Sequence, residues 1–412
     1  MARREGGKQG VSRNERLLEL RLHTDPDRRW QIVTSLDLVA GSEAPRVLLR
    51  GDGVEEQNDQ YQVRSDSAYL DMTDLFVDGL DVRIGRQVLS WGAADVFNPT
   101  DTLAAKSYED PVKFGLNLPS PAVNIHYHVL GFDVNGIWVA KFQAPHLPPG
   151  LEEQFFSSNR IPADFQALAD DFLAHDGQID VTLRPDVPSD SLWGMRIGRN
   201  IAGYDVSVSY ADTRENIPVL GRLDVLAFDP VAYTAKVDAD LVFPRKKVYG
   251  ADFAGQLGFL DDAGIWAEAA WTVPESFQQD IEFLGSTLSS VRALDDGYLK
   301  FTIGGDYTFR SGYLIQTQIV RGFIDENERA LLDTYVLAGF QKSYFHDVLQ
   351  VRLFETYDTD DSGLLVNPDL LWLATDHVQV GLGGLLYGGK SGSKFERTTT
   401  GDQYYLRLRY AF

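Results

Sequence analysis

The feature that most constrains this chain is an alternation of apolar and polar residues with a period of two, which recurs along most of its length. From Leu299 to Phe309, every odd position is apolar or glycine and every even position is polar or glycine. Similar runs occupy 204–210, 313–323, 348–357 and 377–388. Such alternation is typical of β-strands with one apolar face. The runs match the roughly 9–11 residues of a tilted membrane-crossing strand better than the ~5–6 of a soluble sheet.

The connections between these runs are alternately short and long. Short turns joined to long loops are typical of an all-β, transmembrane, antiparallel up-and-down β-barrel with a periplasmic and an extracellular rim. We expect about 16–18 strands in one barrel over 15–412, preceded by a disordered segment 1–14. We count about seventeen strands; since an even number is usual, we expect one more upstream of Glu15 or missing from the sequence. The long connections are 41–61, 92–118, 144–190, 214–244, 274–296 and 389–401.

Composition excludes several other classes of protein. The 412 residues contain no run near the ~18 apolar residues that a membrane helix needs. Without cysteine, neither disulfides nor thiolate metal sites can form. A net charge of −22 argues against nucleic acid as a partner. Residues 1–14 have no apolar core of a signal peptide, so we expect one to have been removed or to be missing.

The C-terminal residues alternate in the same way, with apolar side chains at 404, 406, 408, 410 and 412. This segment resembles the terminal strand of outer-membrane barrels of Gram-negative bacteria. The resemblance implies a location in the bacterial outer membrane and an assembly signal formed by Tyr410 and Phe412. It also implies three partners: outer-membrane lipid, lipopolysaccharide and the barrel-assembly machinery. The alternative is an ordinary amphipathic edge strand.

The segment RIGRQVLSWGAADVFNPTD at 83–101 carries a second resemblance. It is similar to the "GRQ…WG…NP.D" segment of porin-like barrels, including the alginate-export type and related uncharacterised families. The resemblance implies that Arg83, Gln87 and Trp91 line the inner face of a strand and that 98–101 forms a turn inside or above the pore. Arg86 departs from it, because it falls on the lipid face and requires a bulge or a position near the rim.

Strand alternation also assigns polar residues to the lumen. We expect Asp95 and Asp101 near a constriction, with Arg83 and Arg196 opposite. Two loops, 92–118 and 144–190, carry apolar side chains that fit a fold towards the lumen, and the second contains a helix near 162–174. The alternative for that helix is packing on neighbouring loops. The full pore-lining set is Arg83, Gln87, Trp91, Asp95, Asp101, Arg196, Asp252, Glu268, Lys300, Asp306, Gln316, Arg352 and Arg407.

Two patterns raise the question of a metal. His126 and His128 share one face of a strand, but no third ligand is evident. Asp358 and Asp360 match the start of a calcium loop, although 364–373 fits a strand better than an exiting helix. A polar lumen wall and a solvated acidic loop are the favoured interpretations, so we expect neither metal nor cofactor.

The sequence therefore favours a porin or channel that passes hydrophilic solutes by diffusion through a loop-narrowed lumen. The first alternative is a plugged structural or adhesive barrel that binds partners through its outer loops. An outer-membrane hydrolase is the least favoured, because neither G-x-S-x-G nor H-E-x-x-H occurs. We expect no enzyme activity.

Overall fold

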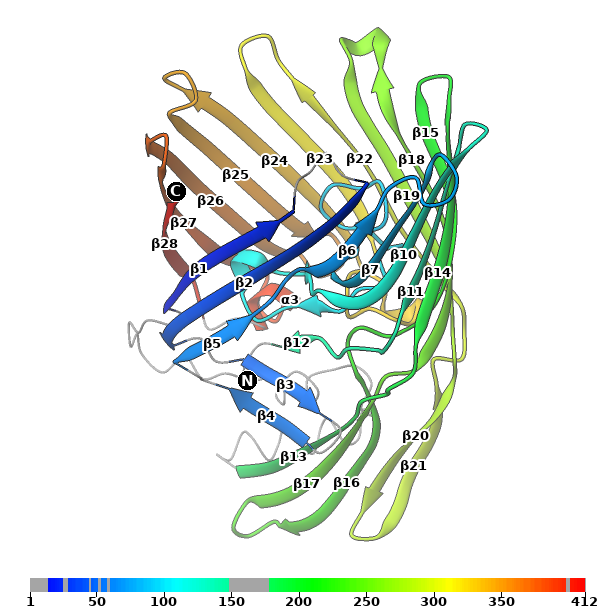
Figure 1. The fold of residues 1–412 in the computed structure, drawn as a ribbon. Helices are drawn as coiled ribbons and strands as arrows, with labels where there is room; N and C mark the ends of the chain where they lie inside the picture. The colour runs from blue at the N-terminus through cyan, green and yellow to red at the C-terminus, as the bar shows by residue number, and fades with distance from the viewer. Residues whose placement is uncertain are drawn as a thin grey trace.

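A large antiparallel sheet curls into a barrel in the computed structural model (Figure 1). The structure describes residues 14–24, 29–43, 46–50, 53–57, 60–147, 178–397 and 401–411. None of the described helices is long and apolar enough to span a membrane.

The barrel sheet contains eighteen described strand elements, and its hydrogen-bonded rows follow one another in chain order. Two of them, β5 and β6, pair with successive parts of β2 and so form one interrupted row. The elements are β1 (Asn14–His23), β2 (Trp30–Glu43), β5 (Tyr61–Arg64), β6 (Ala68–Met72), β7 (Leu80–Gln87), β10 (Ser120–Val129), β11 (Phe132–Val139), β14 (Leu192–Ile201), β15 (Tyr204–Arg214), β18 (Arg245–Leu257), β19 (Ala263–Pro274), β22 (Tyr298–Thr308), β23 (Tyr313–Arg321), β24 (Thr334–Tyr344), β25 (Leu349–Asp358), β26 (Gly363–Thr375), β27 (Val378–Gly389) and β28 (Gln403–Tyr410).

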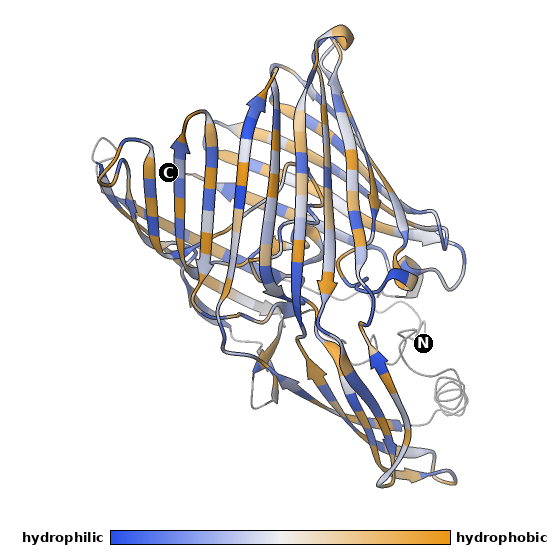
Figure 2. Cartoon of the chain, turned by 90° about the vertical axis from the view of Figure 1, so that its right-hand side faces the viewer, coloured by the Kyte–Doolittle hydropathy of each residue, from blue (hydrophilic) through white to orange (hydrophobic). Residues whose placement is uncertain are grey.

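The alternation of the sequence becomes the two faces of this wall. On β22, Leu299 and Ile303 point outward and are 44% and 52% exposed, whereas Lys300 between them points inward and is 9% exposed. Figure 2 shows the same change of hydropathy from residue to residue along the barrel strands. An apolar exterior is what contact with lipid requires, and strand-to-strand bonding satisfies the backbone N–H and C=O groups there. The predicted outer-membrane β-barrel is confirmed.

Short turns join the strands at one rim and long connections join them at the other (Figure 1). Both β1 and β28, the first and last rows described, run towards the short-turn rim. Asn14 belongs to β1, one residue earlier than expected, and residues 1–13 lie outside the described part. The expected extra strand upstream of Glu15 therefore also lies outside it.

The long connections contain strands that the sequence analysis assigned to loops. One five-stranded sheet, which we call the mouth sheet, has the order β4-β3-β12-β8-β9; a second has the order β13-β17-β16-β20-β21. Their bounds are β3 (Arg46–Arg50), β4 (Gly53–Gln57), β8 (Lys106–Ser107), β9 (Leu116–Asn117), β12 (His146–Leu147), β13 (Gln178–Asp186), β16 (Val219–Asp229), β17 (Thr234–Val242), β20 (Phe277–Phe283) and β21 (Ser286–Ala293). The described helices are η1 (Pro111–Lys113), η2 (Gly258–Leu260), η3 (Arg329–Leu331) and α3 (Lys394–Arg397).

The main apolar core lies between the inner wall and the loops folded against it. Trp91 and Leu103 of the β7–β10 connection pack there with Phe142, Leu147 and Phe243. Burial of such side chains contributes roughly 1.5–3 kcal/mol each, which holds the connection in place. The helix expected at 162–174 lies outside the described residues.

Arg86 is placed on the outer face of β7 by its pairing with Ala68 of β6. Its Nε donates to the carbonyl of Ser65 at 2.7 Å. Ser65 lies in the break between β5 and β6, so this break supplies the irregularity that an outward arginine requires.

Candidate functional site: a loop anchored across the barrel wall

The β7–β10 connection, residues 88–119, is tied to a carboxylate on a distant row of the wall. Glu268 points inward from β19 and is 2% exposed. It accepts hydrogen bonds from the N–H groups of Ala93 at 2.9 Å and Ala94 at 3.3 Å. It also accepts from the N–H and the hydroxyl of Thr100, both at 2.7 Å. A buried carboxylate needs such donors, and these bonds fix the loop against β19. We call residues 88–119 the anchored loop.

Gly92 lets the loop approach Glu268 this closely. Its φ is +100°, a backbone conformation that residues with a Cβ rarely adopt, and a Cβ here would lie 2.4 Å from Glu268 Oε2. The Trp-Gly pair of the porin-like segment therefore has a physical role: tryptophan packs and glycine makes room for the carboxylate.

The two ends of the segment are joined through Asp101. Its Oδ1 accepts from the backbone N–H of Trp91 at 3.3 Å, and its Oδ2 accepts from Lys106 Nζ at 2.9 Å and Asn117 Nδ2 at 2.7 Å. The indole N–H of Trp91 donates to Asn135 Oδ1 on β11 at 2.7 Å. These contacts close the loop on itself and bind it to a second part of the wall.

The tip of the loop reaches a third part of the wall. Asp95 accepts a hydrogen bond from Gln316 of β23. The ring of Phe97 stacks on Phe323, which follows β23, with 5.7 Å between ring centroids. The anchored loop thus contacts β11, β19, β23 and the residue Phe323 that follows β23.

The inward arginines are bonded to aspartates that lie one or two rows away along the wall. Arg83 Nη2 lies 2.7 Å from Asp71 Oδ2, and Arg196 Nη2 lies 2.7 Å from Asp252 Oδ1. Asp369 of β26 contacts both Arg352 and Arg407, the latter at 2.8 Å. The inner wall therefore carries fixed, mostly paired charges.

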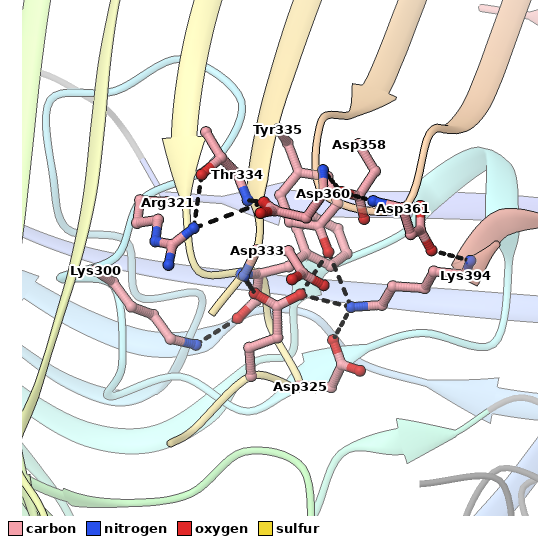
Figure 3. A network of polar contacts seen from close by, with 12 residues as sticks. Lys300, Arg321, Asp325, Asp333, Thr334, Tyr335, Asp358, Asp360, Asp361 and Lys394 are labelled. Atoms are coloured by element: carbon pink, nitrogen blue, oxygen red, sulfur yellow. Dashed lines mark hydrogen bonds and ion pairs between the residues drawn. The ribbon is translucent and has the colours of Figure 1, made fainter. Parts of the chain in front are cut away.

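A second polar network links the loops at the long-loop rim (Figure 3). Lys394 of α3 lies 3.0 Å from Asp325 Oδ1 and 2.8 Å from Glu326 Oε1, and it contacts the Tyr335 hydroxyl at 3.1 Å. Burial lowers the pKa of Lys394, but Asp325 and Glu326 outweigh this effect and raise it. Lys300 donates to the carbonyl of Phe323 beneath this network. The β23–β24 and β27–β28 connections are thereby held together.

The acidic residues of the calcium-loop pattern lie near this network and accept hydrogen bonds from backbone N–H groups. Asp358 Oδ1 accepts from the backbone N–H of Asp360 at 2.9 Å, and Asp360 Oδ2 accepts from the N–H of Thr334 at 2.6 Å. Within the described ranges, no group of three or more His, Asp or Glu residues is arranged to hold a metal ion. Burial, followed by Glu326 and Asp358, raises the pKa of Asp333 to about 6.

The remaining candidates separate into buried and open positions. Gln87 is buried and donates to the carbonyl of Ala122 at 3.1 Å; it supports the wall beneath the anchored loop. His128 lies 2.6 Å from Asp133 near the short-turn rim, and His126 is exposed. Tyr410 points outward at the end of β28, and Phe412 lies outside the described residues.

The sequence analysis missed the partners of the inward residues. Asp71, Asn135 and Asp369 lie opposite or beside a predicted lumen residue on an adjacent row. Strand register would have found them, because residues directly opposite in an antiparallel pair share a face. Lys394 follows no such pattern, since it lies in a loop helix.

The family model described as "Protein of unknown function (DUF1302)" matches residues 11–361. The chain belongs to the DUF1302 family. No curated protein matches its sequence. Among solved structures, OccAB3 of Acinetobacter baumannii is similar, with a TM-score of 0.50 and 8% identity over 97% of this chain and 92% of that one. OpdK of Pseudomonas aeruginosa, solved with vanillate, has a TM-score of 0.49 and 8% identity over 96% and 91%. The first likeness agrees with the outer-membrane barrel fold described above.

Proposed function

We propose that this barrel is a channel through which small hydrophilic solutes diffuse across the outer membrane without being chemically changed. The anchored loop narrows the lumen, and the inward charges select among solutes. The observation that carries the proposal is the attachment of this loop to Glu268, because a loop fixed to the inner wall leaves a defined opening instead of a closed core. A barrel of this size holds an aqueous channel unless something fills it.

The charged inner wall supports the proposal. Arg83, Arg196 and the Arg352–Arg407 pair stand on different rows, each bonded to an aspartate. Charges on a low-dielectric wall act strongly on a passing solute. Such a wall suits passage of polar molecules, whereas a barrel with only a structural role needs no charged interior.

One observation favours the alternative of a plugged barrel that binds partners through its outer loops. The apolar core between wall and loops is a single cluster that includes Leu89, Phe243 and Leu147 of the mouth sheet. A core of this kind closes part of the cross-section of the barrel lumen. The two functions differ in whether the rest of the cross-section stays open.

Planar-bilayer recording separates them. Purified protein reconstituted in a bilayer should give discrete conductance steps, and liposomes containing it should swell in small sugars or amino acids. Absence of both conductance and swelling, in protein that shows the heat-modifiable migration of a folded barrel, would overturn the channel and leave the plugged barrel.

A further inference from the structure

Lys342 is a positively charged residue on the lipid-facing side of the barrel wall. It lies near the end of β24, opposite Tyr313 of β23 and Val351 of β25. It shares the outer face with Phe340, two residues earlier on the strand, which lies opposite the exposed Ile315. A charge on a face that contacts lipid is unfavourable unless it reaches the level of the lipid headgroups.

The position of Lys342 along its strand places it at that level. It lies two residues before the end of β24, beside the short turns 309–312 and 345–348. Its ammonium donates to the carbonyl of Ser311 in the first of these turns. Short turns mark the periplasmic rim of an outer-membrane barrel. The ammonium therefore lies at the headgroup level of the periplasmic leaflet, which consists of phospholipids.

Two tyrosine rings hold the ammonium in place. Lys342 Nζ lies 4.3 Å from the ring centroid of Tyr313 and 5.9 Å from that of Tyr344. Both distances allow cation–π attraction. Phe340 packs on Tyr313 with 5.7 Å between the ring centroids. The tyrosines are 37% and 40% exposed, so they also present apolar surface to the glycerol and acyl parts of a lipid.

The contacts of the ammonium leave its charge without a counterion. Among the described residues, Lys342 Nζ contacts the Ser311 carbonyl and the rings of Tyr313 and Tyr344, and no carboxylate forms an ion pair with it. Arg310, in the same turn as Ser311, is exposed and adds a second positive charge. Two N–H groups of the ammonium thus remain available to an anion from outside the chain.

We propose that Lys342, Tyr313 and Tyr344 form a binding site for the phosphate of a glycerophospholipid in the periplasmic leaflet. The two N–H groups of Lys342 that do not bond to Ser311 donate to phosphate oxygens. The exposed rings contact the glycerol and the upper acyl chains of the same molecule. The site lies on the outside of the wall, so it does not depend on whether the lumen conducts solutes.

Lipid binding to the purified, folded barrel tests the site. Native mass spectrometry measures the apparent affinity for the first phosphatidylglycerol bound, and for diacylglycerol, which has the same chains without the phosphate. Lys342→Met keeps a long apolar side chain without the charge and should weaken phosphatidylglycerol binding about fivefold or more, whereas Lys342→Arg should retain it. Lys236→Met in β17, an exposed lysine outside the barrel wall, is the matched control and should change neither affinity.

The same titrations contain the results that would overturn the site. Equal weakening by Lys342→Met and Lys236→Met would show that only the total charge matters. An equal loss of diacylglycerol binding in Lys342→Met would show apolar contact instead of phosphate recognition. A loss confined to lipopolysaccharide would place the ammonium at the opposite leaflet. Heat-modifiable migration verifies that each variant is folded, and unchanged phosphatidylglycerol binding by folded Lys342→Met also overturns the site.

Discussion

The carboxylate of Glu268 accepts two hydrogen bonds from Thr100, a residue 168 positions earlier, one from its backbone N–H and one from its hydroxyl. Both bonds measure 2.7 Å. They join the middle of the wall to the turn that follows β7. The position of the anchored loop therefore depends on a side chain that is distant in sequence.

Removal of this carboxylate should release the loop. Glu268→Ala leaves the N–H groups of Ala93 and Thr100 without their acceptor, and each lost bond to a charged group costs roughly 1.5–3 kcal/mol. We expect larger single-channel conductance and faster proteolysis within 88–119. Glu275→Ala, an exposed position just beyond the same strand, is the control and should change neither. Unchanged conductance in folded Glu268→Ala would show that the loop does not narrow the lumen.

Gly92 should be intolerant of any side chain. Gly92→Ala places a methyl group against the Glu268 carboxylate and forces an unfavourable φ, so the loop should loosen much as in Glu268→Ala. Gly136→Ala on β11 meets no atom within 4 Å and has no positive φ, so it should behave like the wild type. Conductance histograms of the two variants make the comparison; indistinguishable histograms would contradict this role of Gly92.

The β23–β24 connection should become more stable in acid. The pKa of Asp333 is raised to about 6, so above that pH its charge opposes those of Glu326, Asp358 and Asp360, with Lys394 as the nearby cation. Because the folded state binds this proton more tightly than the unfolded state, stability is gained as the pH falls through 6 towards 4. Hydrogen exchange over 322–333, corrected for intrinsic rates, should be slower at pH 5 than at pH 8. Asp333→Asn should abolish most of the difference; if the difference persists in full, another group is responsible.

A charge on the outer face should oppose membrane insertion. Ile303→Arg on β22 should cost roughly 2–4 kcal/mol if the residue lies near the bilayer midplane. Val231→Arg, in the exposed turn between β16 and β17, should cost little. Unfolding by denaturant in lipid vesicles compares the two variants. Equal costs would contradict the assignment of Ile303 to the lipid face.

The end of the chain should direct assembly. Tyr410→Ala combined with Phe412→Ala removes the last two apolar residues of the alternating segment, and we expect less folded barrel in the outer membrane at unchanged synthesis. Heat-modifiable migration of membrane fractions measures the folded share. Leu226→Ala in β16, an exposed apolar residue outside the barrel wall, is the control. Normal assembly of the double variant would disprove the assembly signal.

Much of the barrel could be predicted because lipid imposes a strict rule on each strand. Leu299 and Ile303, at odd positions, face outward, and Lys300, at an even position, faces inward, as the alternation predicts. The rule fails for strands beyond the barrel wall. The register of β16 shifts at Leu220/Arg222 and again at Val225/Ala227, and these shifts interrupt its alternation. The sequence analysis therefore assigned this segment to a loop. Each extra residue moves the core-facing set between even and odd positions, from Leu220 to Leu223 and Val225 and then to Phe228, so no single alternating run crosses the strand.

The candidate site could be predicted only in part, for a different reason. The alternation of apolar and polar residues places Glu268 on the inner face of the wall. The resemblance of 83–101 to porin-like segments places a loop towards the lumen. Nothing local connects the two, because the bonds from Ala93 and Thr100 to Glu268 form only when the wall curves.

The mouth sheet has a consequence for the order of folding. Its strand β12 pairs with β3 and β8, which belong to two other connections, so the sheet requires three hairpin regions to be in place first. Contacts of such large sequence separation form late, because loop-closure entropy opposes them until the intervening segments are ordered. We therefore expect an assembly intermediate whose wall is already in the membrane while the mouth sheet does not yet cover its outer end. Shortening the β2–β5 connection should delay formation of the mouth sheet without slowing membrane insertion of the wall.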